Sequence, residues 1–241
     1  HPELNKVSSI NDHYHIKGLP NRFAGQGSEK YEQPIKGNKK FDIFKNWEKS
    51  SLKNSEYIAL FLEKKKLRNV YLVTGGAIAF VVDSIGKRKY SSLYCFQHEQ
   101  SASMAADTVW RVSKEKSVGV CMATSGPGAV NLLSGLGCSY VDSIPSICIT
   151  GQVNIKESSK YGYANLRQAG YQEIDIVSMS KKVTKFSIQV NSANELKYNL
   201  AKAYHEATTG RKGPVLIDVP MDIQQIEVGE YEEFDFYNDS K

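Results

Sequence analysis

The side chain best suited to acid–base chemistry is Glu99, in the run Phe96-Gln97-His98-Glu99-Gln100. It follows a short apolar segment and precedes a segment rich in small residues, 101–106. A carboxylate at the start of a helix is commonly explained by its interaction with the helix dipole. The small residues behind Glu99 would, however, also let a flat ligand or another chain approach closely. The sequence leaves both interpretations open, a structural carboxylate and one that takes part in proton transfer.

A glycine-rich loop, Thr124-Ser125-Gly126-Pro127-Gly128-Ala129, is the second candidate. Gly126 and Gly128 permit close approach to the backbone, and Pro127 suits the first turn of a helix. Such a loop resembles an anion-binding helix start. It lacks the Walker lysine and the G-x-G-x-x-G spacing, so a nucleotide site is poorly supported. Taken alone, a structural Gly-Pro turn is an equally good interpretation.

Metal and nucleic-acid chemistry find little support in this sequence. His13 and His15 stand two apart without further nearby ligands, so we expect no metal site in this chain. The four cysteines lack any C-x-x-C spacing and are best interpreted as reduced core thiols. The formal net charge of +5 is scattered along the chain. It indicates solvated helix faces rather than a nucleic-acid surface, and we expect no nucleic-acid partner.

The elements that must position these residues alternate from residue 51 onward. Strands are expected at 70–73, 91–95, 117–122, 144–150, 183–190 and 215–219. Helices are expected from the cap Ser55 to Leu67 and at 77–85, 98–112, 127–138 and 193–209. Strands alternating with helices indicate βαβ units. The predicted fold class is α/β, a doubly wound parallel sheet flanked by helices.

Such a sheet brings the loops that follow its strands to one edge, where ligands bind. The loops expected there are Thr74-Gly75-Gly76, Gln97-His98-Glu99, the segment 123–128 and Thr150-Gly151-Gln152. Glu99 and the glycine-rich loop are therefore expected to lie close together in the folded protein.

The domain organisation follows from composition. Residues 1–50 are polar, rich in Pro and Gly and without a sustained period, and are assigned only as an N-terminal arm or the end of a preceding domain. Residues 51–228 form the predicted domain, and the acidic, aromatic segment 229–241 is interpreted as the start of a linker to a missing middle domain. No apolar stretch approaches the roughly 20 residues of a membrane helix, and no signal peptide is evident. We expect a cytoplasmic protein with no membrane partner.

Ordered motifs connect these loops to a known family. They lie at 73–77, 98–107, 123–131, 142–145, 149–153, 172–173 and 213–222. Over these motifs the segment 51–226 resembles the pyrimidine-binding domain of thiamine-diphosphate enzymes of the acetolactate synthase group. Its Val-Thr-Gly-Gly form is also similar to a branch associated with bacterial polysaccharide gene clusters.

The resemblance implies a thiamine-diphosphate-dependent transferase or lyase, a decarboxylase or carboligase acting on a 2-oxo acid. The catalytic residues implied are Glu99, which would hydrogen-bond the cofactor's aminopyrimidine ring and promote deprotonation of its thiazolium carbon, and Gln152, which would line the reaction pocket. The cofactor-binding residues implied are Gly75, Glu99, Thr124, Pro127 and Asn131. For His98, a structural role and a role in the site are equally well supported.

The family binds the cofactor's diphosphate and Mg²⁺ through a separate domain with a Gly-Asp-Gly motif, which this sequence lacks. The resemblance therefore implies a fragment or one subunit of a split enzyme, completed by a missing diphosphate-binding domain or subunit. The complete protein is expected to be a homodimer or homotetramer.

The sequence departs from acetolactate synthases at Thr74, at Thr108-Val109-Trp110 and at Tyr171. These departures put pyruvate in doubt and leave a sugar-derived or other larger 2-oxo compound as the alternative substrate. The non-enzymatic alternative is a dimerisation or regulatory domain with the same fold.

Overall fold

The computed structural model describes residues 51–161, 166–234 and 236. The described residues belong to one compact unit. The segment 1–50, for which an arm or the end of a preceding domain was expected, lies outside the described residues, and so do His13 and His15.

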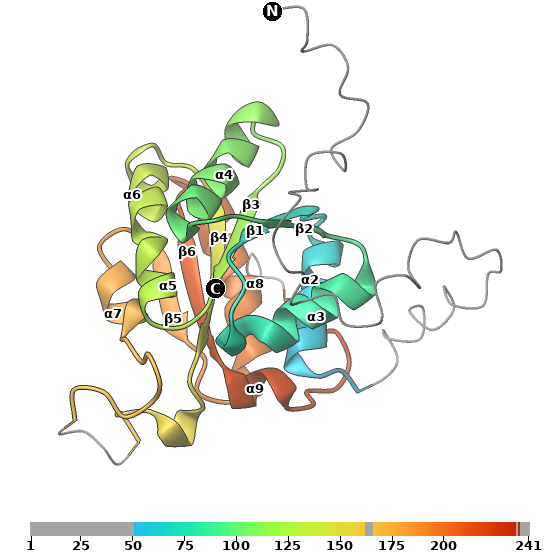
Figure 1. Cartoon of the computed structure of the whole chain (residues 1–241). Coiled ribbons are helices and arrows are strands. Elements are labelled where there is room, and N and C mark those ends of the chain that lie inside the picture. The colour runs from blue at the N-terminus through green and yellow to red at the C-terminus, as the bar shows by residue number, and fades with distance from the viewer. Residues whose placement is uncertain (1–50, 162–165, 235, 237–241) are drawn as a thin grey trace, which may run out of the picture. The chain divides into compact units, whose positions relative to one another are not determined.

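One sheet of six strands lies at the centre of the described domain, in the order β2-β1-β3-β4-β6-β5 (Figure 1). The strands are β1 (Asn69–Leu72), β2 (Ser92–Cys95), β3 (Gly119–Ala123), β4 (Ser146–Gln152), β5 (Phe186–Gln189) and β6 (Val215–Pro220). Every neighbouring pair runs parallel. The expected α/β fold with a parallel, helix-flanked sheet is confirmed.

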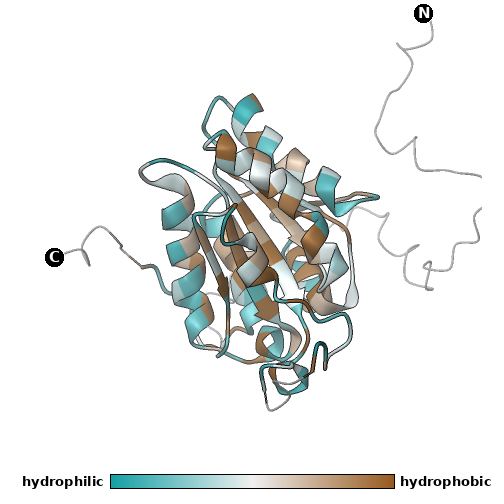
Figure 2. Ribbon diagram, turned by 90° about the vertical axis from the view of Figure 1, so that its left-hand side faces the viewer, coloured by the Kyte–Doolittle hydropathy of each residue, from teal (hydrophilic) through white to brown (hydrophobic). Residues whose placement is uncertain are grey.

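Helices cover both faces of this sheet. One face carries α2 (Asn54–Lys64), α3 (Ala79–Arg88), α8 (Glu195–Thr208) and α9 (Met221–Gln225). The other face carries α4 (Glu99–Val112), α5 (Pro127–Asn131), α6 (Leu133–Val141) and α7 (Ile176–Ser180). Two short 3-10 turns, η4 (Gly76–Ile78) and η5 (Ile155–Glu157), complete the described elements. Figure 2 shows hydrophobic residues gathered along the strands and on the helix sides that face them.

The central strands are apolar because both of their faces are covered. Every residue of β3, β4 and β6 is buried, as is typical of parallel strands between two helical layers. Alternate residues serve the two cores, with Met122 in one apolar cluster and Cys121 in the other. The edge strand β2 is mostly exposed.

The helix expected at 127–138 is wrong as a single element, because the structure divides it into α5 and α6. The Leu132 N–H bonds to the Ala129 carbonyl, three residues back, at 3.1 Å. That pattern is the tighter 3-10 turn, which interrupts the α-helical hydrogen bonding. The loop expected at Thr150-Gly151-Gln152 is also different. These residues are the last three of β4 and pair with β6.

The start of α2 corrects a second expectation. Lys53 is the N-cap, and its N–H donates to the Glu56 carboxylate at 2.9 Å. Ser55, expected as the cap, lies inside the helix and accepts a hydrogen bond from the Ser84 hydroxyl at 3.0 Å. The short helices α7 and α9 were not expected, because five residues are too few to show a helical period.

Residues near the C-terminal end of the described chain pack on α2 and α8. The ring of Tyr231 stacks on Tyr57 at 5.2 Å between centroids, and the Tyr57 hydroxyl donates to the Glu232 carbonyl at 2.9 Å. The Lys197 ammonium donates to the Glu230 carbonyl at 2.8 Å. The expected start of a linker at 229–241 stays a prediction.

No helix in the described ranges is long and apolar enough to cross a membrane. The same residues contain no cluster of three or more His, Cys, Asp or Glu side chains that could hold a metal ion.

Candidate functional site

The direction of winding reverses between β1 and β3. The chain forms β2 on one side of β1 and then returns to place β3 on the other side. In open α/β sheets, ligands bind outside the carboxyl ends of the strands at this switch point. A ligand site is therefore expected in the segments that follow β1, β2 and β3.

The segments that follow β1 and β3 lie against each other at Gly75 and Thr124. A methyl group added at Gly75 would lie 2.4 Å from Cβ of Thr124, so a side chain has no room at this position. The Thr124 hydroxyl oxygen accepts a hydrogen bond from the Ala77 N–H at 3.3 Å. The predicted cofactor-binding residues Gly75 and Thr124 are thus brought together.

Glu99 joins them from the segment after β2. It is the first residue of α4 and is buried, with 9% of its surface exposed. Its Oε2 atom accepts a hydrogen bond from the Asn131 side-chain amide at 2.9 Å. A methyl group added at Gly128 would lie 3.2 Å from Glu99 Oε1 and 2.9 Å from Thr124 Cγ2. Gly75, Glu99, Thr124, Gly128 and Asn131 are called the Glu99 cluster below.

His98 has a structural task beside this cluster. It is the N-cap of α4, and its Nδ1 atom accepts a hydrogen bond from the Gln100 N–H at 3.2 Å. This bond satisfies one of the free amides at the helix start and holds the turn from which Glu99 projects.

The Glu99 carboxylate keeps one oxygen available for a ligand. Among the described residues, Asn131 supplies its one hydrogen bond, and that bond is to Oε2. The missing side chains at Gly75 and Gly128 let Thr124 and Glu99 pack against the backbone, while Gly75 and Thr124 stay partly exposed. A flat ring with a polar edge suits this arrangement, because the ring can lie close to the backbone while its edge meets Oε1.

Pro127 is the first residue of α5, between Thr124 and Gly128 in the same loop. Its N-cap, Gly126, has φ of 64°, a conformation that favours glycine. A methyl group added at Gly126 would also lie 2.1 Å from the Gln172 carbonyl oxygen. The loop is therefore held against the segment around residue 172.

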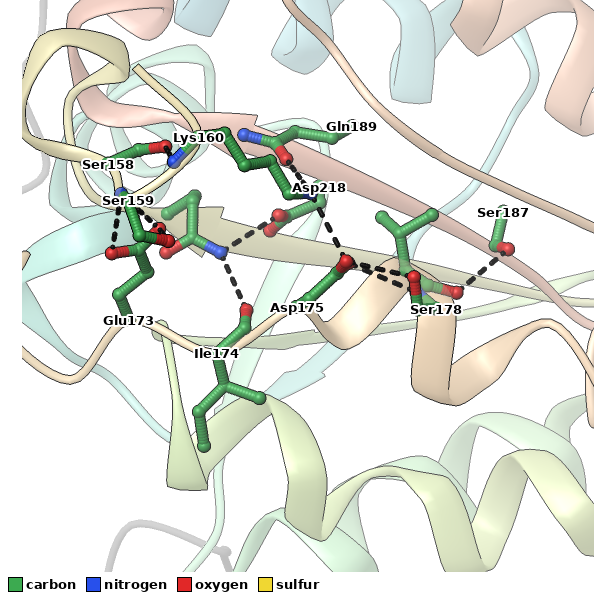
Figure 3. Close-up of polar contacts among 12 residues, drawn as sticks. Ser158, Ser159, Lys160, Glu173, Ile174, Asp175, Ser178, Ser187, Gln189 and Asp218 are labelled. Carbon is green, nitrogen blue, oxygen red and sulfur yellow. Dashed lines mark hydrogen bonds and ion pairs between the residues drawn. The ribbon is translucent and has the colours of Figure 1, made fainter. Parts of the chain in front are cut away.

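Gln152 belongs to a second group, formed where β4 and β6 end. Figure 3 shows two members of this group, Ile174 and Asp218. Its Nε2 atom donates to the Ile174 carbonyl and to Asp218 Oδ2, each at 3.1 Å, and its Oε1 atom accepts from the Val153 N–H at 3.0 Å. The Thr150 hydroxyl donates to Asp218 Oδ1 at 2.7 Å. Thr150, Gln152, Ile174 and Asp218 are called the Gln152–Asp218 cluster, and these contacts do not join it to the Glu99 carboxylate.

Asp218 is the site residue that sequence reasoning missed. It is 1% exposed, and burial raises the pKa of its carboxyl to about 7 although hydrogen bonds from Thr150 and Gln152 oppose the shift. Perturbed titration in a ligand-binding region is a common property of functional groups. The available signal was a charged residue inside the apolar run Val215–Pro220.

A small polar cavity of about 110 Å³ opens beside this second cluster. It is lined by Gln152, Ser159, Lys160, Arg167, Glu173, Ile174, Asp175 and Gln189. A larger groove of about 540 Å³ lies where β3, β4 and β6 begin, at the edge away from both clusters. Arg111 in that groove is paired with Asp107 and Asp142, each at 2.6 Å, which neutralises part of its charge.

The sequence is similar to those of known proteins. Residues 52–179 match the family model of the thiamine pyrophosphate enzymes, N-terminal TPP binding domain. The chain is 37% identical over 201 residues to the acetolactate synthase large subunit of Cyanidium caldarium, covering 81% of this chain and 32% of that protein. It is 39% identical over 173 residues to the acetolactate synthase isozyme 2 large subunit of Escherichia coli K12, covering 72% of this chain and 30% of that protein.

The acetolactate synthase large subunit of Corynebacterium glutamicum is 38% identical over 167 residues, covering 69% of this chain and 25% of that protein. The chain thus spans about a third or less of the length of these relatives. The resemblance inferred from the motifs is confirmed. The chain belongs to the thiamine pyrophosphate enzymes, carries their N-terminal TPP-binding domain, and is homologous to acetolactate synthase large subunits.

Proposed function

We propose that the complete protein is a thiamine-diphosphate-dependent decarboxylase or carboligase acting on a 2-oxo acid. In this proposal Glu99 is the carboxylate that activates the cofactor. The observation that carries the proposal is the Glu99 cluster at the switch point, in a domain of the TPP-binding family. The chain supplies the activating half of the site.

The residues present fit the pyrimidine ring of the cofactor. Gly75 and Thr124 are partly exposed beside the Glu99 carboxylate, so the edge of a ring would reach that carboxylate from this side. Thr124, Pro127 and Asn131 would contact or support that ring. When bound, the cofactor supplies a carbon nucleophile and an electron sink for the loss of CO₂ from a 2-oxo acid.

The task of Glu99 is to share a proton with a nitrogen at the ring edge. Oε1 is the atom left for this exchange, because Oε2 is held by the Asn131 amide. Burial removes competing water, so a hydrogen bond formed there is stronger than one at the surface. The position of Glu99 at the start of α4, held by the His98 cap, keeps the carboxylate aimed at the site.

The other half of the site is proposed to lie outside this chain. A diphosphate-binding domain or subunit would hold the diphosphate and Mg²⁺. The chain covers only about a third of the length of its relatives, which supports a further domain or subunit. We propose a cytoplasmic homodimer or homotetramer as the complete assembly.

A larger, polar 2-oxo compound is the second candidate for the substrate, beside pyruvate. The cavity beside Gln152 favours it, because seven polar side chains line that space and only Ile174 is apolar. Tyr171, one of the departures from acetolactate synthases, is 81% exposed in this chain. Turnover of pyruvate alone, with acetolactate as the product, would argue against the larger substrate.

The substitution Glu99→Gln in the complete protein tests the proposed function. It keeps the shape of the side chain but removes its proton exchange, so we expect cofactor-dependent turnover to fall about 100- to 10,000-fold. Asp107→Asn is the matched control, since Asp107 is a buried carboxylate on the same helix that contacts Arg111 and Ser139 rather than the Glu99 cluster. Asp107→Asn should retain turnover, and unchanged turnover in Glu99→Gln would refute the proposal.

Calorimetry of the complete protein with thiamine diphosphate and Mg²⁺ separates the enzyme from the non-catalytic alternative. An enzyme should show saturable binding. A dimerisation or regulatory domain with the same fold should show none.

A further inference from the structure

Asp218 is a buried acid to which the proposed chemistry assigns no task. It lies in β6 directly across from Thr150 of β4, with Gln152 two residues further along the same face. Burying a carboxyl group costs free energy unless its oxygens are hydrogen-bonded. Here both oxygens are bonded, one to the Thr150 hydroxyl and the other to the Gln152 amide.

These contacts determine which way the Gln152 amide points. Both protons of the amide nitrogen are used, since Nε2 donates to Asp218 Oδ2 and to the Ile174 carbonyl. The amide oxygen accepts from the Val153 N–H. A flipped amide would set its oxygen against two acceptors and its nitrogen against a donor. The surroundings therefore select a single orientation.

The second acceptor, the Ile174 carbonyl, is itself held in place. The neighbouring Glu173 carboxylate accepts hydrogen bonds from the backbone N–H groups of Ser159, Ala169 and Gly170 at 2.8 to 3.2 Å. On the other side, Asp175 caps α7 by accepting from the Ser178 N–H at 3.1 Å. Figure 3 shows Ile174 between these two anchored carboxylates.

We propose that Asp218 is a positioning residue, which together with the Ile174 carbonyl holds the Gln152 side chain in one orientation at the wall of the polar cavity. The amide oxygen is then the atom that Gln152 can offer to a ligand as an acceptor, because both amide protons are already used. The effect on turnover rests on the proposed function, in which Gln152 lines the reaction pocket. The orientation of the Gln152 side chain does not depend on the proposed function.

Nuclear magnetic resonance of the full-length protein tests the orientation without any ligand. The side-chain amide signals of Gln152 are assigned by their loss in Gln152→Ala and followed from about pH 5 to about pH 9. Because burial raises the pKa of Asp218 to about 7, both signals should shift with an inflection near that pH. Asp218→Asn should abolish the inflection. Asp222→Asn is the matched control, since Asp222 accepts from the Ile155 N–H instead and should leave the inflection in place.

A double-mutant cycle on turnover gives the second readout. Gln152→Ala and Asp218→Leu should each lower kcat/KM about tenfold, and the double variant should resemble Gln152→Ala, because Asp218 acts through Gln152. If Asp218→Leu does not fold, Asp218→Asn decides, since its amide oxygen can still accept from Gln152 and kcat/KM should stay within about threefold of the wild type.

Several outcomes would overturn the proposal. These are Gln152 signals that do not change with pH, an inflection that persists in Asp218→Asn, additive losses in the cycle, or a tenfold loss in Asp218→Asn. A protein without cofactor-dependent turnover would refute the proposed function instead, and the amide signals would then decide the orientation alone.

Discussion

The Glu99 cluster and the Gln152–Asp218 cluster each contain a buried carboxyl group at the carboxyl edge of one sheet, but they use it differently. Glu99 is 9% exposed and receives one hydrogen bond from the described residues, from Asn131. Asp218 is 1% exposed, and both of its oxygens are bonded within the protein. A carboxylate oxygen without a protein partner is free to bind a ligand. A carboxylate with both oxygens hydrogen-bonded within the protein instead holds its neighbouring side chains in place.

The two clusters are connected through one loop. Gly126 is the N-cap of α5 beside the Glu99 cluster, and it lies against the Gln172 carbonyl, two residues before Ile174 of the other cluster. We therefore expect changes at Gly126 to affect both clusters. Changes at Asp218 or Gly128 should affect only the cluster to which the residue belongs.

The largest effect is expected from Gly126→Ala. The new methyl group would lie 2.1 Å from a backbone oxygen, at a φ of 64°. We expect a loss of about 5 kcal/mol in the free energy of unfolding, measured by urea denaturation. Gly86→Ala is the control, because nothing lies within 4 Å of its added methyl group and alanine favours the helix. A loss at Gly126 no larger than in the control would contradict the close packing of this loop against the Gln172 carbonyl.

The second largest effect is expected in the pH dependence of stability, and it arises from the ionisation of Asp218. Its folded pKa of about 7 lies above the unfolded value, so the stabilising contribution is complete at low pH and is lost as the pH rises toward 7. The loss amounts to roughly 4 kcal/mol between about pH 4 and pH 7. Asp218→Asn cannot ionise and should gain stability relative to the wild type by that order at pH 8.

Urea unfolding of both proteins at several pH values measures this difference. A constant difference between Asp218→Asn and the wild type across the pH range would contradict the assignment of Asp218 as the titrating group. Asp222→Asn, on α9, is the control, since Asp222 lies outside the Gln152–Asp218 cluster.

The smallest effect is expected from Gly128→Ala. The methyl group would lie 2.9 Å from Thr124 Cγ2 and 3.2 Å from Glu99 Oε1, where the proposed ring binds. We expect the cofactor affinity of the complete protein to fall about tenfold, with a loss of about 1 to 2 kcal/mol in the free energy of unfolding, because Thr124 must shift to admit the methyl group. Gly137→Ala, whose nearest neighbour is 4.0 Å away, should bind normally. Unaltered affinity in Gly128→Ala would place the ring elsewhere.

Much of the architecture was predictable. The parallel sheet and its order of elements follow from the alternation of apolar runs with helical periods, which are local properties. The division of the expected helix at 127–138 was not predictable, because its apolar pattern continues through the turn at Leu132. The small helices α7 and α9 were missed for the related reason that they are too short to show a period.

The sequence by itself determined that Glu99 and the glycine-rich loop share one edge of a parallel sheet, because the carboxyl ends of parallel strands must meet there. Only the tertiary structure decided which side chains join. Asn131 reaches Glu99 across 32 residues of sequence, and Gln152 reaches Asp218 across 66. Such contacts depend on the register between strands and on side-chain direction. Local sequence does not encode those properties. Gln152 was therefore predicted as a residue that lines the reaction pocket, whereas its bonding to Asp218 was not predicted.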